Sequence, residues 1–341
     1  MAADDGPSRE APSQVVELLN AFLTVQALHA AAVLGLADTL AAGSVTMEAL
    51  VASTGAHGPS LYRLLRMLTG TGVVREESDG RFSLTPLGEP LRSDVPGSVR
   101  DWALYVGAPA PWDAWGRLHD AVMSGTTGFE LAHGVPTYEY LAQHPEVGGP
   151  FDRWMTRQSE LHNPAIVAAL DLTGVTTVAD IGGGQGSLLG AILQANPSMT
   201  GILLDLPHVV ADAVAIHAAD VADRCQVIGG DLLAAVPPGA DFYLIKRVLM
   251  LLGDEDAVRA LRLCAEALPP HGKVLVIEMV MLTNNHPSPA KTFDLLMLLA
   301  NPGGAIRTEE QFRDLFAAAG LRLTRVIPTT SPNRILESVP A

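Results

Sequence analysis

The pattern of apolar and polar positions predicts a helical first third that ends in a small hairpin. From Val15 to Leu40 apolar residues recur every three or four positions, which predicts a helical segment. Thr46 is placed to cap a second helix, and a turn over residues 55–59 leads to a third. Two short apolar runs then flank Asp79-Gly80, a hairpin signal. Helix, turn, helix and hairpin is the order of a winged helix.

In the second half, short apolar runs alternate with helical segments such as Ser187–Ala195. This alternation predicts an α/β, Rossmann-like doubly wound sheet with mainly parallel strands. The last two runs are joined only by Pro328–Asn333, which is too short for a crossover helix, so we expect an antiparallel hairpin at the sheet edge. The seven expected strands cover residues 178–181, 201–205, 225–228, 242–245, 273–278, 321–327 and 334–338.

The region between these parts, residues 101–171, holds all four tryptophans and reads as helices interrupted by glycine and proline. Its aromatic and methionine side chains suit either a flat apolar pocket or an ordinary core. The chain is therefore divided into a flexible tail, a winged-helix dimerisation domain, a helical linker and pocket region, and a cofactor-binding domain. These parts cover residues 1–14, 15–105, 106–171 and 172–341.

Charge argues against nucleic acid as a partner. The chain has a net charge of −15, and between Ser44 and Arg100 six arginines are balanced by six acids, so no basic face is expected. Dimerisation is the better reading of this domain. The apolar stretch Ala27–Leu40 is interrupted by polar residues and is shorter than a membrane span, and the acidic N-terminus lacks the order of a signal peptide. Together with only two cysteines, these features predict a soluble cytoplasmic protein without a metal site.

The segment Val178–Leu189 is the strongest chemical signal. It reads as strand, glycine turn and helix, and glycine there permits positive φ and close approach of a ligand to the backbone. Such a turn alone is weak evidence, but the next strand ends in Asp205, where a carboxylate would hold a ribose diol. Both NAD and S-adenosylmethionine (SAM) fit a glycine turn followed by a ribose-binding aspartate. Asp180 before the glycines, and Asp231 beside apolar Leu232 after the third strand, favour SAM.

Several segments together resemble one family, the two-domain class I SAM-dependent O-methyltransferases of plant caffeate type and of bacterial natural-product tailoring, including phenazine and anthracycline pathways. They are Asp180-Ile-Gly-Gly-Gly-Gln-Gly, Leu203-Leu-Asp-Leu-Pro, Gly230-Asp, Leu244-Ile-Lys-Arg-Val-Leu and Asn301-Pro-Gly-Gly. The resemblance extends from about Val15 to Ser338 and implies a homodimer that methylates an aromatic small molecule and releases S-adenosylhomocysteine. By position it implies SAM-binding roles for Ser159, Gly182, Gly184, Asp205, Asp231, Leu232 and Lys246. It likewise implies substrate-binding roles for Phe151, Met155, Met297 and Asn301.

The chain departs from the family at the catalytic base. The family has a His-Asp-Trp segment after the Lys-Arg-Val-Leu run, whereas this chain has Met250-Leu-Leu. Of the two acids that flank the family's base, Glu278 is retained, as a tentative catalytic residue, and the other position is Ile306. Loss of a general base typically forfeits about 10²–10⁴-fold in rate.

Two hypotheses follow from this departure. The favoured one is methylation of a hydroxyl, ring nitrogen or carboxylate of an aromatic or polyketide-like secondary metabolite, by proximity and orientation. The alternative is a SAM-binding relative that catalyses hydroxylation, decarboxylation or a pericyclic step. A ligand-sensing winged-helix regulator fits less well, because the cofactor motifs are complete and the chain is acidic.

Overall fold

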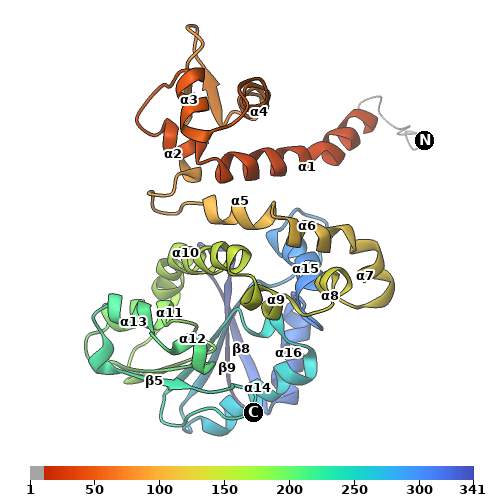
Figure 1. Ribbon diagram of the computed structural model, residues 1–341. Helices are drawn as coiled ribbons and strands as arrows, with labels where there is room; N and C mark the ends of the chain where they lie inside the picture. The colour runs from red at the N-terminus through yellow and green to blue at the C-terminus, as the bar shows by residue number, and fades with distance from the viewer. Residues whose placement is uncertain (1–10) are drawn as a thin grey trace, which may run out of the picture. The chain divides into compact units, whose positions relative to one another are not determined.

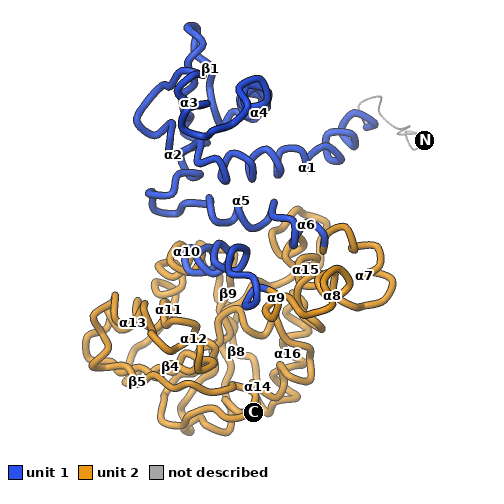
Figure 2. The backbone as a smooth tube through the Cα atoms, in the orientation of Figure 1, with its two compact units in different colours: residues 1–113, 141–157 blue, residues 114–140, 158–341 orange. Residues whose placement is uncertain are grey.

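The computed structural model describes residues 11–341, which form two compact units (Figure 2). Unit 1 contains the described residues up to 113 together with 141–157, and unit 2 contains residues 114–140 and 158–341. Residues 114–140 and 158–171, assigned from the sequence to a separate linker, therefore pack within unit 2. Three helices cross the unit boundaries: α6 (Pro109–Gly116), α9 (Thr137–Gln143) and α10 (Pro145–Ala169).

Unit 1 confirms the winged-helix prediction. Its elements are α1 (Ala11–Val33), α2 (Leu36–Leu40), α3 (Met47–Thr54), α4 (Gly58–Gly70), β1 (Val74–Glu76), β2 (Phe82–Leu84), the 3₁₀ turn η1 (Glu89–Leu91) and α5 (Arg100–Val106) (Figure 1). The hydroxyl of Thr46 accepts the N–H of Ala49 at 3.3 Å, so Thr46 caps α3 as expected. The strands β1 and β2 pair antiparallel.

Two details at the start of the chain differ from the sequence reading. Of the tail predicted over residues 1–14, residues 1–10 lie outside the described residues, and residues 11–14 are helical because α1 begins at Ala11. Pro12 is tolerated there, since the first turn of a helix has no internal acceptor for its N–H groups. The single helical segment expected to Leu40 is divided, because Gly35 adopts φ +63° between α1 and α2.

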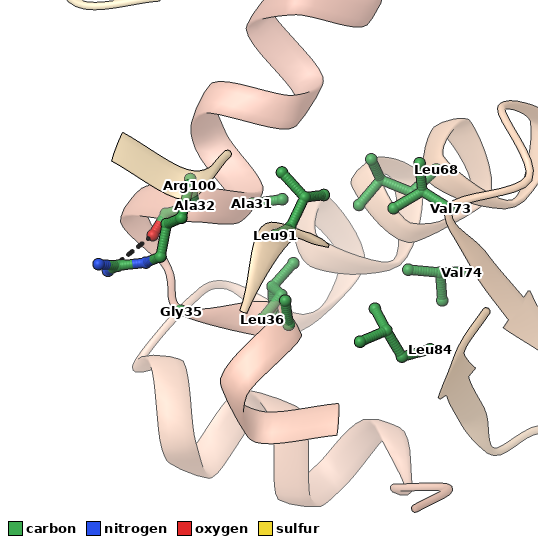
Figure 3. Close-up of a pocket in the computed structure, with 11 residues that line it drawn as sticks. Ala31, Ala32, Gly35, Leu36, Leu68, Val73, Val74, Leu84, Leu91 and Arg100 are labelled. Carbon is green, nitrogen blue, oxygen red and sulfur yellow. Dashed lines mark hydrogen bonds between the residues drawn. The ribbon is translucent and has the colours of Figure 1, made fainter. Parts of the chain in front are cut away.

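The core of unit 1 lies where α1, α2, α4 and the hairpin meet. Figure 3 shows Ala31, Leu36, Leu68 and Leu91 around a small apolar space, with Arg100 at its margin. The guanidinium of Arg100 donates to the carbonyl of Ala32 at 3.1 Å, so this charged group caps the end of α1. The space is lined by hydrocarbon and is part of the domain core rather than a polar site.

The outer part of α1 is unusual in being apolar and exposed. Val15, Leu18, Leu19 and Phe22 are at least half exposed. Within residues 11–341, α1 is the one helix whose length and composition would allow it to cross a membrane, a test that core helices and signal sequences also pass. The exposed apolar part of α1 therefore precedes Ala27–Leu40, the stretch that the sequence pattern indicated.

Unit 2 is the predicted α/β fold. Its seven-stranded sheet has the order β5-β4-β3-β6-β7-β9-β8, in which the first five strands are parallel and β9 is antiparallel to both neighbours. The strands are β3 (Thr177–Ile181), β4 (Thr200–Asp205), β5 (Cys225–Gly229), β6 (Phe242–Lys246), β7 (Lys273–Glu278), β8 (Leu321–Pro328) and β9 (Arg334–Pro340). The predicted edge hairpin is confirmed.

Helices cover both faces of this sheet. The helices of unit 2 are α7 (Leu118–Ser124), α8 (Gly128–His133), α11 (Ser187–Ala195), α12 (Pro207–Val210), α13 (Val214–Ala218), α14 (Asp254–Ala267), α15 (Pro289–Ala300) and α16 (Glu309–Ala318), with 3₁₀ turns η2 (Ala222–Arg224) and η3 (Leu249–Leu251). Of these, α7, α8 and α15 pack on one another. Alternate strand residues enter two cores, because successive side chains point to opposite faces. Ala179 packs in the core with α14 and α16, and Val178 packs in the one with α11. This packing fixes the carboxyl ends of the parallel strands.

Candidate active site

The glycine turn after β3 has the geometry that the sequence predicted. Gly182, Gly184 and Gly186 adopt φ of +69°, +61° and +85°. A Cβ at Gly182 would lie 2.6 Å from the side chain of Val248, whereas a Cβ at Gly184 would meet nothing within 4 Å. The turn is therefore closely packed at its base and open at Gly184, where a ligand can approach the backbone.

Asp205 ends β4 beside this turn. One carboxylate oxygen accepts the N–H of Gly184 at 2.7 Å, and the other accepts the N–H of Leu206 at 2.7 Å. An ionised carboxylate has about four lone-pair sites, so further donors such as a ribose diol can still be bound. Asp231, after β5, accepts the N–H of Leu233 at 2.8 Å, and neighbouring Leu232 is partly buried. These residues fit the ribose and adenine ends of SAM.

A partly buried polar network adjoins the turn at Ser187. The Lys246 ammonium donates to Asn163 Oδ1 at 2.9 Å, and Asn163 Nδ2 donates to Ser187 Oγ at 2.9 Å. Burial lowers the pKa of Lys246 to about 8, and burial raises the pKa of Asp180 to about 6, opposed by the charge of Lys246. Lys246, expected from the resemblance to bind SAM, is here tied to α10 and the start of α11. Asn163 and Ser187 were missed, because nothing in their local sequence marks them.

The ends of β6 and β7 have a different character. Met250, on η3, packs in a cluster with Met279, Ala290, Met297 and Ile306, all at most 5 % exposed. The carbonyl of Met250 accepts the N–H of Ala305 at 3.0 Å, which places the loop after α15 beside η3. The position of the family's base and that of its second acid therefore share one methionine-rich surface.

Glu278 is the buried acid of this apolar region. Its side chain is fully buried, one oxygen accepts the N–H of Met250 at 3.1 Å, and the second oxygen has no hydrogen-bond partner in the described chain. Burial raises the pKa of Glu278 to about 7, although the N–H of Met250 and the charges of Arg247 and Arg307 oppose this. A carboxyl group with a pKa near neutrality is suited to proton transfer.

Arg307 holds the turn that carries Met250. It is 2 % exposed, and its guanidinium donates to the carbonyls of Leu249 and Leu252, each at 2.7 Å. It also pairs with Asp254 at 2.7 Å. This role of Arg307 could not be predicted from the sequence, because hydrogen bonds to two distant carbonyls leave no mark in residue spacing.

The remaining expected residues lie on α10 and at the end of α15. Phe151 and Met155 are in the first half of α10, within unit 1, where Phe151 packs on Tyr105 with ring centroids 4.9 Å apart. Ser159 lies further along the same helix, in unit 2. Asn301, 6 % exposed, donates to the sulfur of Met297 at 3.4 Å.

Comparison with known proteins agrees with this geometry. Residues 115–322 match the O-methyltransferase domain, and residues 16–94 match the O-methyltransferase dimerisation domain. The chain belongs to the O-methyltransferase family. It is 38 % identical to a phenazine O-methyltransferase of Lysobacter antibioticus over 96 % of each chain.

Two solved structures of this family show ligands relevant to the site. A methyltransferase of calicheamicin biosynthesis, bound to S-adenosylhomocysteine, is 38 % identical with a TM-score of 0.86, covering 99 % of this chain and 100 % of the other. An O-methyltransferase from neocarzinostatin biosynthesis, in complex with SAM and 2-hydroxy-5-methyl naphthoic acid, is 32 % identical with a TM-score of 0.81, covering 93 % and 96 %. This O-methyltransferase is therefore a SAM-dependent enzyme.

Proposed function

We propose that this enzyme transfers a methyl group to a hydroxyl, ring nitrogen or carboxylate of an aromatic or polyketide-like secondary metabolite, mainly by proximity and orientation. The observation that carries the proposal is the combination of a complete cofactor turn with Met250 and Ile306 in an apolar cluster. The relatives reported above act on, or were solved with, a phenazine and a naphthoic acid, which supports a flat aromatic acceptor.

SAM would supply an activated methyl sulfonium, and the chain would supply its placement. We assign the binding of SAM to Ser159, Gly182, Gly184, Asp205, Asp231 and Leu232, with Lys246 acting through its bonds to Asn163. Alignment of a nucleophile with such a centre provides effective molarities of about 10⁵–10⁸ M. That exceeds the 10²–10⁴-fold typically lost with a general base, so an acidic acceptor needs little help from the protein.

Glu278 is the residue we assign to proton transfer. Its unpartnered oxygen lies in the region that carries Met250, and its raised pKa leaves it partly ionised near neutral pH. We assign contact with the acceptor to Phe151, Met155, Met297 and Asn301. Met297 and Asn301 are buried next to one another, which suits a closely fitted apolar surface.

The replacement of the base by Met250 also favours a second candidate, in which bound SAM supports hydroxylation, decarboxylation or a pericyclic step. The two functions differ in the fate of the cofactor. Methyl transfer releases one S-adenosylhomocysteine for each product, and this ratio can be measured by quantitative chromatography of both. Turnover of substrate with SAM left intact would exclude the favoured function.

We also propose that the enzyme is a cytoplasmic homodimer assembled through the winged-helix domain, residues 15–105, without nucleic-acid or membrane partners. The match to a dimerisation domain supports self-association. The exposed face of α1, with Leu18 at 76 % and Leu19 at 68 %, suits burial against a second copy. Leu18→Glu with Leu19→Glu should give a monomer in sedimentation; a persistent dimer would place the interface elsewhere.

A further inference from the structure

Arg247 is a partly buried cation whose position is not explained by the cofactor residues or by an ion pair with Glu278. It follows β6 directly, and its backbone N–H donates to the carbonyl of Ile277 at 3.0 Å, so it lies at the carboxyl end of the sheet beside Glu278. Its φ is +57°, a conformation that non-glycine residues seldom adopt. Strained backbone of this kind persists where the surroundings hold it, and it clusters at functional sites.

The contacts of the Arg247 guanidinium are few for its five donors. It donates to Gln158 on α10, and it lies over the ring of Phe293 on α15, 5.4 Å from the centroid. Its Nε is inaccessible to solvent and has no hydrogen-bond partner in the described chain. No ion pair joins it to Glu278 among residues 11–341, although the two charges are close enough to affect one another.

Removing a guanidinium from water costs free energy unless a counter-charge offsets it. Desolvation disfavours the charged form and lowers the pKa of Arg247, and no ion-paired carboxylate in the described part of the chain offsets it. Glu278 neutralises it only partly, because burial raises the pKa of that carboxyl to about 7. Phe293 packs against the methionine cluster, so Arg247 brings positive charge to the edge of an otherwise apolar surface.

We propose that Arg247 binds a carboxylate on the acceptor, and hence that the substrate is an aromatic hydroxy acid. The inference rests on the proposed methyl transfer, whose acceptor residues it extends. A guanidinium binds a carboxylate through two parallel N–H donors, and no carboxylate of residues 11–341 pairs with Arg247 in this way. An aromatic ring against Phe293 and the methionine cluster would direct its carboxylate toward Arg247 and its hydroxyl toward Glu278.

The test compares two probes that differ only in the carboxylate, 3-hydroxy-2-naphthoate and 2-naphthol. Binding of each to the full-length enzyme saturated with S-adenosylhomocysteine is measured by calorimetry. We expect the wild type to bind the acid at least tenfold more tightly. In Arg247→Met this preference should disappear, through a ten- to hundredfold loss for the acid and a change below threefold for the naphthol.

Three controls separate this role from a structural one. Arg247→Lys keeps a charge without the paired donors and should retain part of the preference. Arg259→Met removes an exposed arginine on α14 and should change neither probe. Equal weakening of both probes, or loss of S-adenosylhomocysteine binding in Arg247→Met and Arg247→Lys alike, would overturn the proposal and make Arg247 a support for α10.

The binding readout is independent of turnover. If the acid is preferred through Arg247 but SAM is never demethylated, the inference about the ligand stands and methyl transfer fails. If methyl transfer occurs and the wild type shows no preference for the acid, the inference fails and the proposed function stands.

Discussion

The carboxyl edge of the sheet in unit 2 has a polar half, at the ends of β3, β4 and β5, and an apolar half, at the ends of β6 and β7. At the ends of β3, β4 and β5, glycine backbone and carboxylates such as Asp205 form short hydrogen bonds around an open turn. At the ends of β6 and β7, the corresponding surface is made of methionine and isoleucine around one buried acid, Glu278. Under the proposed function, the first half binds SAM and the second half binds the acceptor. The proposal therefore assigns polar recognition to one half of the edge and apolar packing to the other.

The largest expected effect is a loss of cofactor affinity, from a substitution at the end of β4. Asp205→Ala removes a carboxylate that fixes Gly184 and would bind the ribose, so we expect the affinity for S-adenosylhomocysteine to fall about a thousandfold. Calorimetry measures this, with exposed Asp212→Ala as the matched control. Undiminished affinity would refute the ribose assignment.

The next largest effect is a loss of stability, from a substitution that removes the support of η3, the turn after β6. Arg307→Ala removes the guanidinium donors of both carbonyls and leaves that of Leu252 without a donor in the described chain, while that of Leu249 keeps only the N–H of Leu252. This should lower the free energy of unfolding by about 3 kcal/mol. Urea denaturation is the measurement, and Arg313→Ala on the exposed side of α16 is the control. A loss below about 1 kcal/mol would mean that η3 does not depend on the clamp.

The same contrast explains what the sequence could and could not predict. The fold and the cofactor turn were predictable, because strand periodicity, Gly182 and Asp205 are local signals with fixed spacing. The replacement at Met250 was visible as well, since it stands in a recognisable run.

The supporting contacts were not predictable, because they join residues far apart in the chain. Lys246 reaches Asn163 and Arg247 reaches Gln158, pairs whose members belong to different elements. The separation of α1 from α2 depended on the backbone conformation of Gly35, and glycines also occur inside helices. Long-range packing, rather than composition, decides such features.

A smaller effect concerns the acid of the acceptor half. Glu278→Gln should lower kcat/KM about ten- to a hundredfold at pH 8 without changing the affinity for S-adenosylhomocysteine. In the wild type kcat/KM should rise as the pH passes about 7, where Glu278 ionises, and the variant should lack that rise. A pH profile identical in both proteins would remove Glu278 from the mechanism.

The free energy of unfolding of the wild type should fall over the pH range in which its kcat/KM rises. Because the pKa of Glu278 is raised from 4.5 to about 7 in the folded enzyme, its contribution to stability is present below pH 4.5 and is lost as the pH rises through about 7. Glu278→Gln cannot ionise, so its stability relative to the wild type should increase between pH 5 and 8. Denaturation curves at both pH values test this sign.

The smallest expected effect comes from placing histidine, the family's base, at residue 250. In Met250→His an imidazole would enter the cluster of Met279, Met297 and Ile306, where burial lowers its pKa and keeps it neutral. Glu278 is close enough to orient it, but the second acid is missing because residue 306 is isoleucine. We therefore expect only a few-fold gain, confined to weakly acidic phenols, and none for acidic acceptors.

The double variant Met250→His with Ile306→Glu restores both the base and the second acid of the family. Its rate with weakly acidic phenols should exceed that of Met250→His alone, whereas the rate of Met250→Leu should match that of the wild type. Rates with acceptors of graded acidity, compared at one pH, measure the effect. A gain that is equal for all acceptors would show that residue 250 acts through packing. A gain that grows as the acceptor becomes less acidic would show that the apolar cluster limits the enzyme to acceptors that release their proton unaided.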